Sequence, residues 1–291
     1  MSPRVAAAPI SWGVCEVPGW GHQMPAERVL SEMAALGCAA TEFGPDGFLP
    51  ADPGERKRML ADHGLTAVGG FVPVILHDPG HDPLPEVRAQ LPAFLASGAD
   101  TLVLAAATGL SGYDQRPALD AGGWRTLLSR LDELTALAAD HGIRATLHPH
   151  VGTMVERPDE IWRVLDGSSV PLCLDTGHIL VGGGSPAEIA AKAAGRVAHA
   201  HLKDVDATMA ARVRDGGIGY RDAVAAGMYR PLGRGDAGIA DVIAALSAAG
   251  YDGWYVMEQD AVLAAEPASD AGPAGDVRRS LDYLVELLST P

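Results

Sequence analysis

The sequence is poor in cysteine and contains no long apolar run. Its 291 residues include three cysteines, Cys15, Cys38 and Cys173, an odd number without C-x-x-C spacing. This pattern excludes a disulfide framework and a cysteine zinc site, and it predicts a cytoplasmic protein. No uninterrupted run reaches the ~18 apolar residues of a membrane span, and residues 1–12 lack the apolar core of a leader peptide. We therefore expect a soluble protein with no membrane partner and no cleaved leader.

Basic residues are also scarce. The chain has 22 Lys and Arg against 37 Asp and Glu, which gives a formal net charge of −15 and a pI near 4.9. Because nucleic-acid binding depends on neutralising phosphates with basic side chains, we exclude nucleic acid as a partner. Hydrophobic residues make up 47% and charged residues 20%, as in ordinary folded domains. The length is near the ~250 residues of a β/α barrel, so we expect one domain over residues 1–291.

Short apolar runs rich in β-forming residues alternate with longer segments of helical spacing. Several runs are apolar on both faces, which is typical of strands in a buried parallel sheet. Glycine directly follows helical segments at Gly98, Gly142 and Gly250, where it favours a left-handed C-cap. The predicted strands are Val5–Ile10, Ala39–Phe43, Thr66–Val74, Thr101–Ala105, Arg144–His148, Pro171–Asp175, Ala198–Leu202 and Trp254–Glu258. The predicted helices are Pro25–Ala35, Leu84–Ala96, Trp124–His141, Pro158–Leu165, Pro186–Ala194, Ile239–Ala248 and Val277–Leu288.

Repeated strand and helix units favour a parallel sheet, and eight of them indicate a closed single (β/α)8 TIM barrel. A doubly wound sheet is the alternative. Two long loops, Thr108–Gly123 and Asp204–Asp236, follow predicted strands and are rich in Gly, Arg and Asp. We expect these loops to carry specificity.

Ionisable side chains interrupt the apolar strands near their C-terminal ends. All such ends face the same side of a parallel barrel, so these side chains are expected to meet at one mouth. The residues are Glu42, His148, His150, Asp175, His178, His199, His201, Lys203 and Glu258.

A divalent cation explains why carboxylates and imidazoles would be buried together. An isolated buried carboxylate is costly, whereas Asp175 and Glu258 offset the charge of a 2+ ion, and neutral imidazoles from His148 and His201 complete a mixed N/O shell. We expect one divalent transition metal: Mn, Co, Fe or Zn. Because alternate strand residues share a face, His148 pairs with His150 and His199 with His201, and alternation alone does not pick the ligand from each pair.

Two tryptophans near the first strand have two interpretations. Trp12 and Trp20 are either packing residues of the barrel or an apolar wall against a sugar ring. We predict that Trp12 binds substrate.

The chain resembles the xylose-isomerase-like barrels and, among them, the inosose dehydratases of inositol breakdown. The resemblance covers nearly the whole chain. It implies a metal at His148, Asp175, His201 and Glu258, and substrate contacts from His150, His178 and Lys203; Glu42 is a further candidate substrate-binding residue. The motifs that carry it are Ala8-Pro9-Ile10-Ser11-Trp12, Thr41-Glu42-Phe43-Gly44, His148-Pro149-His150-Val151-Gly152-Thr153, Leu174-Asp175-Thr176-Gly177-His178, His199-Ala200-His201-Leu202-Lys203-Asp204-Val205, Gly227-Met228-Tyr229, Pro231–Asp236 and Glu258-Gln259-Asp260.

The sequence departs from the dehydratases at Gly13–Val17, where they continue with a polar run, and at Asp206, where they usually have arginine. These departures concern the substrate more than the metal.

The hypothesis is a metal-dependent lyase that dehydrates a cyclic keto-polyol through an enolate. Glu258, with His148 or His150, is the candidate base. Lys203 or His178 is the candidate acid or stabilises the enolate oxygen. The alternatives are a metal-dependent sugar epimerase or isomerase, and a sugar-binding barrel without catalysis. The expected partner is a small polyol or keto-sugar, and a homo-oligomer is compatible with the sequence.

Overall fold

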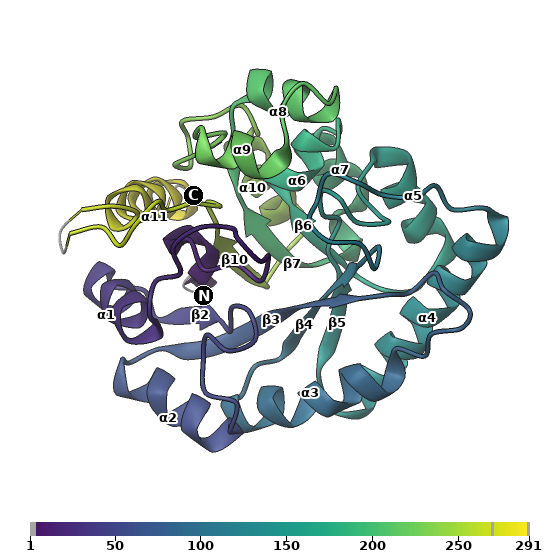
Figure 1. Cartoon of the computed structure of the whole chain (residues 1–291), viewed down its shortest axis with the longest axis horizontal. Helices are drawn as coiled ribbons and strands as arrows, with labels where there is room; N and C mark the ends of the chain where they lie inside the picture. Colours follow the sequence, from purple (N-terminus) through teal and green to yellow (C-terminus); the bar gives the residue numbers. More distant parts are fainter. Residues whose placement is uncertain (1–3, 269–270, 290–291) are drawn as a thin grey trace.

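The computed structural model describes residues 4–268 and 271–289 and contains a closed parallel barrel (Figure 1). Around the ring, the strands follow the order β1-β10-β7-β6-β5-β4-β3-β2, and pairing between β1 and β10 closes it. This confirms the predicted (β/α)8 TIM barrel. The barrel strands are β1 (Arg4–Ala7), β2 (Ala40–Glu42), β3 (Thr66–Val74), β4 (Thr101–Ala106), β5 (Arg144–Leu147), β6 (Leu172–Asp175), β7 (Val197–Leu202) and β10 (Trp254–Met257).

Helices surround the strands on the outside of the barrel (Figure 1). The predicted left-handed caps are confirmed, because Gly98, Gly142 and Gly250 have φ of 73°, 71° and 77°. The helices are α1 (Ala26–Leu36), α2 (Pro53–Asp62), α3 (Leu84–Ser97), α4 (Ala121–Asp140), α5 (Pro158–Gly167), α6 (Thr176–Val181), α7 (Pro186–Ala193), α8 (Ala207–Arg214), α9 (Tyr220–Ala225), α10 (Ile239–Ala248) and α11 (Ala274–Ser289), with 3-10 turns η1 (Pro9–Trp12) and η2 (Ala194–Arg196).

The first strand is shorter than predicted. It ends at Ala7, and the 3-10 turn η1 replaces its expected end at Ile10. Pro9 lacks a backbone N–H, so it suits the first position of a helical turn rather than a sheet interior. Helices α2, α6, α8 and α9 were not predicted, nor was the antiparallel pair β8 (Asp204–Val205) and β9 (Tyr229–Arg230).

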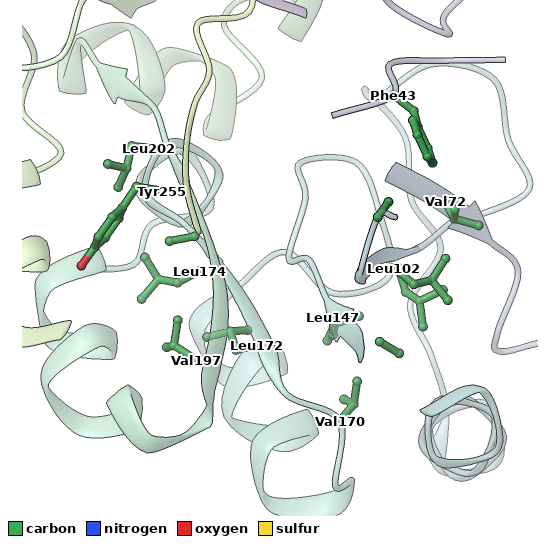
Figure 2. Close-up of a cluster of buried hydrophobic side chains, with 14 of the residues drawn as sticks. Phe43, Val72, Leu102, Leu147, Val170, Leu172, Leu174, Val197, Leu202 and Tyr255 are labelled. Carbon is green, nitrogen blue, oxygen red and sulfur yellow. The ribbon is translucent and has the colours of Figure 1, made fainter. Parts of the chain in front are cut away.

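Alternation along the strands separates two layers of side chains. Outward-facing residues such as Leu147, Leu172, Leu174 and Leu202 pack in the main core between the barrel and its helices (Figure 2). Small inward-facing residues form a separate cluster of Ala6, Ala8, Ala40, Val68 and Val256. Glu42 and Glu258 follow Ala40 and Val256 by two positions and therefore share the inner face.

The segment between β7 and α10 forms a cap of two short helices and the β8–β9 pair. It lies on one side of the barrel beyond α6 (Figure 1), and α8 packs against α6. The carboxylate of Asp204 folds the end of this segment, because it accepts hydrogen bonds from the backbone N–H groups of Gly233, Gly235 and Ala237 at 2.8–3.0 Å.

Among the residues that the structure describes, no helix is long and apolar enough to cross a bilayer.

Candidate active site

A cavity of about 920 Å³, a volume that includes its open mouth, lies among the residues that follow the strands. Trp20 lines this cavity and donates its indole N–H to the carbonyl of Ala261 at 2.9 Å. Trp12 is fully buried in the main core instead, where its indole N–H donates to Glu32 at 2.8 Å. The residues predicted from sequence that line the cavity are Glu42, His148, His150, His201, Lys203 and Glu258.

The Asp-Thr-Gly-His motif turns the chain from β6 directly into α6. Asp175 caps this helix, since its Oδ1 accepts from the backbone N–H of His178 at 2.8 Å. Thr176 Oγ1 donates to the Lys203 carbonyl at 2.7 Å and accepts from the Lys203 N–H at 2.8 Å, which fixes β6 against the end of β7. A Cβ on Gly177 would lie 2.6 Å from the Cβ of Lys203, so only glycine fits there.

The second oxygen of Asp175 faces other side chains that were predicted as metal ligands. Asp175 Oδ2 lies 3.1 Å from His148 Nε2 and 3.7 Å from His201 Nδ1. The same His201 nitrogen lies 3.1 Å from Glu258 Oε2. Potential donor atoms of His148, Asp175 and His201 all lie within 4.8 Å of one another. Three of the four predicted ligands are therefore spaced closely enough to hold one cation, and Glu258 lies beside this group through its contact with His201.

Electrostatics keep the carboxylates of this group ionised. Burial raises the pKa of Glu258, but the charges of His201 and Lys203 outweigh it and lower this pKa to about 2. Burial also opposes ionisation of Asp175, whose pKa is nevertheless well below its usual value, mainly because of Lys203 and His178. Burial lowers the pKa of His148 to about 4, so this imidazole is neutral at pH 7 and free to bind metal.

Glu42 reaches His199 and His201 from the other side of the barrel. Its Oε1 lies 2.8 Å from His199 Nε2 and 3.0 Å from His201 Nε2. Burial raises the pKa of Glu42, but His201 and then the His199 hydrogen bond outweigh it and lower this pKa. These three residues also lie close enough to hold an ion as a separate group.

Lys203 is the cation at the centre of the site. Its ammonium lies 3.0 Å from Glu258, 2.9 Å from Asp260 Oδ1 and 3.5 Å from Asp175 Oδ2, and it donates to His178 Nε2 at 2.9 Å. Burial lowers its pKa, but the three carboxylates outweigh this effect and hold the pKa well above its usual value. Lys203 is therefore charged at neutral pH.

Sequence reasoning did not assign Asp260, Tyr220 or Tyr229 a role. Tyr220 donates to Asp260 Oδ2 at 2.8 Å, and its hydroxyl lies 2.8 Å from that of Tyr229. A signal existed for Asp260, because it follows Glu258 by two positions and shares its face. No signal marked Tyr220, which comes from helix α9 of the cap.

His150 forms part of the cavity wall. Its ring stacks near His178, with centroids 3.7 Å apart, and near Tyr113, with centroids 4.6 Å apart. Tyr113 belongs to the long loop after β4 and donates to Glu16 at the cavity rim. The backbone of Tyr113 lies so close to Gly152 that a side chain there would clash with it, which explains the glycine in the His-Pro-His-Val-Gly-Thr motif.

The geometry brings the predicted metal ligands and most predicted substrate residues to one place. Three predicted residues, Asp175, His178 and His199, do not line the cavity but contact the side chains that do. Trp12 lies in the core. The individual roles of these residues stay predictions.

Comparisons with known proteins agree with this fold. Residues 30–287 match the family model described as xylose isomerase-like TIM barrel. The chain is 32% identical over 271 residues to the rhizopine catabolism protein MocC of Rhizobium meliloti, covering 89% of this chain and 82% of that protein. It is 31% identical over 270 residues to the inosose dehydratase of Geobacillus kaustophilus, covering 88% of this chain and 87% of that protein.

Solved structures show the same fold at low sequence identity. An L-ribulose 3-epimerase superposes with a TM-score of 0.71 at 14% identity and covers 99% of this chain and 95% of its own. The IolI protein with a bound zinc atom superposes with a TM-score of 0.70 at 13% identity and covers 98% of both chains. The protein is an enzyme related to the inosose dehydratases. It belongs to the xylose isomerase-like TIM barrel family.

Proposed function

We propose that this enzyme is a divalent-metal-dependent hydro-lyase that dehydrates a cyclic keto-polyol of the inosose type. The observation that carries the proposal is the convergence of two imidazoles and two carboxylates beside a charged lysine at the cavity. Relatives named inosose dehydratase match about nine tenths of the chain, which supports this substrate class.

The donor set fits a single transition metal. His201 Nδ1 is buried without a hydrogen-bond partner and faces oxygens of Asp175 and Glu258. An electron-rich pocket of this kind attracts a cation, and mixed N/O ligands suit Mn, Co, Fe or Zn. We assign His148, Asp175, His201 and Glu258 as the ligands. The zinc in the structurally similar IolI protein supports a metal in this fold.

The residues around the cavity supply the proton chemistry. When bound, a divalent ion polarises a ketone oxygen as a Lewis acid. His150 donates from Nδ1 to the Val151 carbonyl at 2.8 Å, so its Nε2 carries a lone pair. Burial, and then the charge of Lys203, lower the pKa of His150 and keep it neutral at pH 7. We assign His150 as the base, with Glu258 as the alternative.

Charge and atoms balance in the proposed elimination. His150 takes the proton next to the ketone, and the C–H electron pair forms an enolate whose oxygen the Lys203 ammonium stabilises. The bond to the β-hydroxyl then breaks, and this oxygen leaves as water with the proton that His150 carried. His178 holds Lys203 in place at 2.9 Å. Trp20 on the cavity wall offers an apolar surface to the ring of the substrate.

A sugar epimerase is the second candidate, favoured by the placement of two acid–base groups. His150 follows β5 and Glu258 follows β10, three places apart around the barrel. Such an arrangement allows proton removal from one face and return to the other. For either reaction, we also propose that the enzyme is cytoplasmic and that it forms a homo-oligomer.

Metal content provides the first test. Mass spectrometry of the purified protein should find about one transition metal per chain, lost in Asp175→Ala and Glu258→Ala. Asp206→Ala is the matched control, because Asp206 also caps a helix, α8, but lies outside the donor set. Asp206→Ala should retain the metal.

Product analysis separates the two reactions. The protein loaded with Mn or Co is incubated with inosose and with ketohexoses. A new ultraviolet-absorbing diketone supports the dehydratase, whereas a change in optical rotation alone supports the epimerase. Wild-type protein that stays free of metal and inert after Mn or Co addition would contradict both.

A further inference from the structure

Glu42 crosses the interior of the barrel to bind two histidines of one strand. It lies at the end of β2, whereas His199 and His201 lie on β7, three places away around the ring. All three side chains are less than 5% exposed. One oxygen, Oε1, contacts Nε2 of His199 at 2.8 Å and Nε2 of His201 at 3.0 Å. A carboxylate oxygen accepts hydrogen bonds, so both imidazoles donate to it.

This contact decides which nitrogen of His201 faces the metal ligands. Because Nε2 is the nitrogen that donates to Glu42, Nδ1 is the nitrogen of His201 that is left to bind a metal. Nδ1 is the nitrogen that points toward Glu258 Oε2 at 3.1 Å and Asp175 Oδ2 at 3.7 Å. Glu42 therefore fixes the orientation of the His201 ring, although no described contact joins Glu42 itself to Asp175 or Glu258.

His199 in turn fixes Glu42. It is fully buried, and it does not line the cavity. Its described hydrogen bond is the one to Glu42, while its Nδ1 is buried without a partner. His199 therefore has no route to a substrate, and its contact holds the Glu42 carboxylate in the position from which it reaches His201.

We propose that Glu42 is a positioning residue that sets His201 for metal binding, with His199 holding Glu42 in place. This inference rests on the proposed metal-dependent function. It differs from the sequence-based expectation that Glu42 binds substrate. Carboxylates that orient a metal-binding imidazole in this way typically affect metal affinity by about 10–100-fold.

Two variants separate the charge of Glu42 from its hydrogen bond. Glu42→Gln keeps an acceptor oxygen but removes the charge, and Co(II) affinity should fall about tenfold. Glu42→Met removes both, and the affinity should fall about 100-fold. The matched control is Glu32→Gln, because Glu32 also accepts from a buried aromatic N–H, that of Trp12, but lies outside the donor set. This control should bind Co(II) as the wild type does.

The assay is titration of the metal-free full chain with Co(II), followed by its visible absorption, with thermal unfolding measured in parallel. In the zinc-loaded protein, NMR of the His201 ring should show a proton on Nε2 that is shifted downfield in the wild type. This resonance should move upfield in Glu42→Met. A purely structural role of Glu42 would change the unfolding temperature but not the ring resonance of the folded protein.

The outcomes distinguish the inference from the proposed function. If the wild type binds Co(II) and folded Glu42→Gln and Glu42→Met bind it equally well, the positioning role is overturned. If Glu42→Met does not fold, Glu42→Gln decides alone, and unchanged affinity again overturns the role. If the wild type itself binds no Co(II), the metal-dependent function fails and takes this inference with it.

Discussion

Replacing Thr176 with valine should destabilise the protein and displace Lys203. Valine has nearly the shape of threonine but no hydroxyl, and the Thr176 hydroxyl makes two hydrogen bonds, at 2.7 and 2.8 Å, with the backbone of Lys203. Both residues are buried. A buried backbone group that loses its partner costs about 1–3 kcal/mol, so two of them cost roughly 2–6 kcal/mol. The variant should still fold, since domains are stable by about 5–15 kcal/mol.

The loss of stability is measurable by thermal unfolding, and the displacement of Lys203 is measurable by enzyme kinetics. With about 2.1 cal/mol/K of unfolding entropy per residue, 291 residues give about 0.6 kcal/mol/K, so a loss of about 3 kcal/mol lowers Tm by about 5 °C. The ammonium of Lys203 depends on the same backbone, and a displacement of about 1 Å costs about 100-fold in rate. Thr176→Ser keeps the hydroxyl and should retain most of both properties.

The comparison of the two variants refutes or supports the reasoning. Urea denaturation and calorimetry measure their stability, and turnover of the substrate measures their activity. If Thr176→Val is as stable and as active as Thr176→Ser, the hydroxyl does not fix Lys203.

Further predictions concern the surroundings of Lys203 and one loop contact. Asp260→Asn should lower Tm by about 2–5 °C, because the buried Asp260 carboxylate binds Lys203 and Tyr220 and a hydrogen bond to a charged group contributes about 1.5–3 kcal/mol; an unchanged Tm in calorimetry would count against this. Gly177→Ala should destabilise the protein by about 1–3 kcal/mol in urea, since its Cβ would lie 2.6 Å from that of Lys203. Burial raises the pKa of Glu160, but the hydrogen bond and charge of Arg116 outweigh it and hold this pKa below its usual value. The Glu160–Arg116 ion pair therefore stabilises the fold at pH values above the pKa of Glu160 in the unfolded chain. This stabilisation is lost as the pH falls through the lower pKa of the folded protein. The stability difference between the wild type and Glu160→Gln should therefore shrink between about pH 5 and pH 3, and a constant difference would argue against the ion pair.

Much of the barrel could be predicted because its strands are apolar and regularly spaced. The helix ends were also marked, since glycine at positions 98, 142 and 250 takes the left-handed conformation that the sequence indicated. Helix α2 could have been predicted from sequence, because Asp52 is a favoured N-cap residue and Pro53 is suited to the first position of a helix. The cap between β7 and α10 was not predictable, because its helices are short and its shape depends on backbone groups that fold around Asp204.

The convergence of the site could be predicted, but not its internal contacts. Closure of a parallel barrel brings every strand end to one side, whatever the details. Which nitrogen of His201 meets Glu42 depends on side-chain conformations across the barrel, and no spacing along the chain encodes that. The same holds for Tyr220, which reaches Asp260 from 40 residues away.

Closure of the ring by β1 and β10 also sets the order in which the protein is completed during synthesis. The proposed ligands His148, Asp175 and His201, which lie at or just after the ends of β5, β6 and β7, emerge from the ribosome well before Glu258, which follows β10. Until β10 is made, β1 and β7 have unpaired edges, and such edges can pair with other chains. A ribosome that stalls between residues 205 and 250 therefore leaves a nascent chain that lacks Glu258 and exposes two strand edges, which makes it a substrate for chaperones rather than a partly active enzyme.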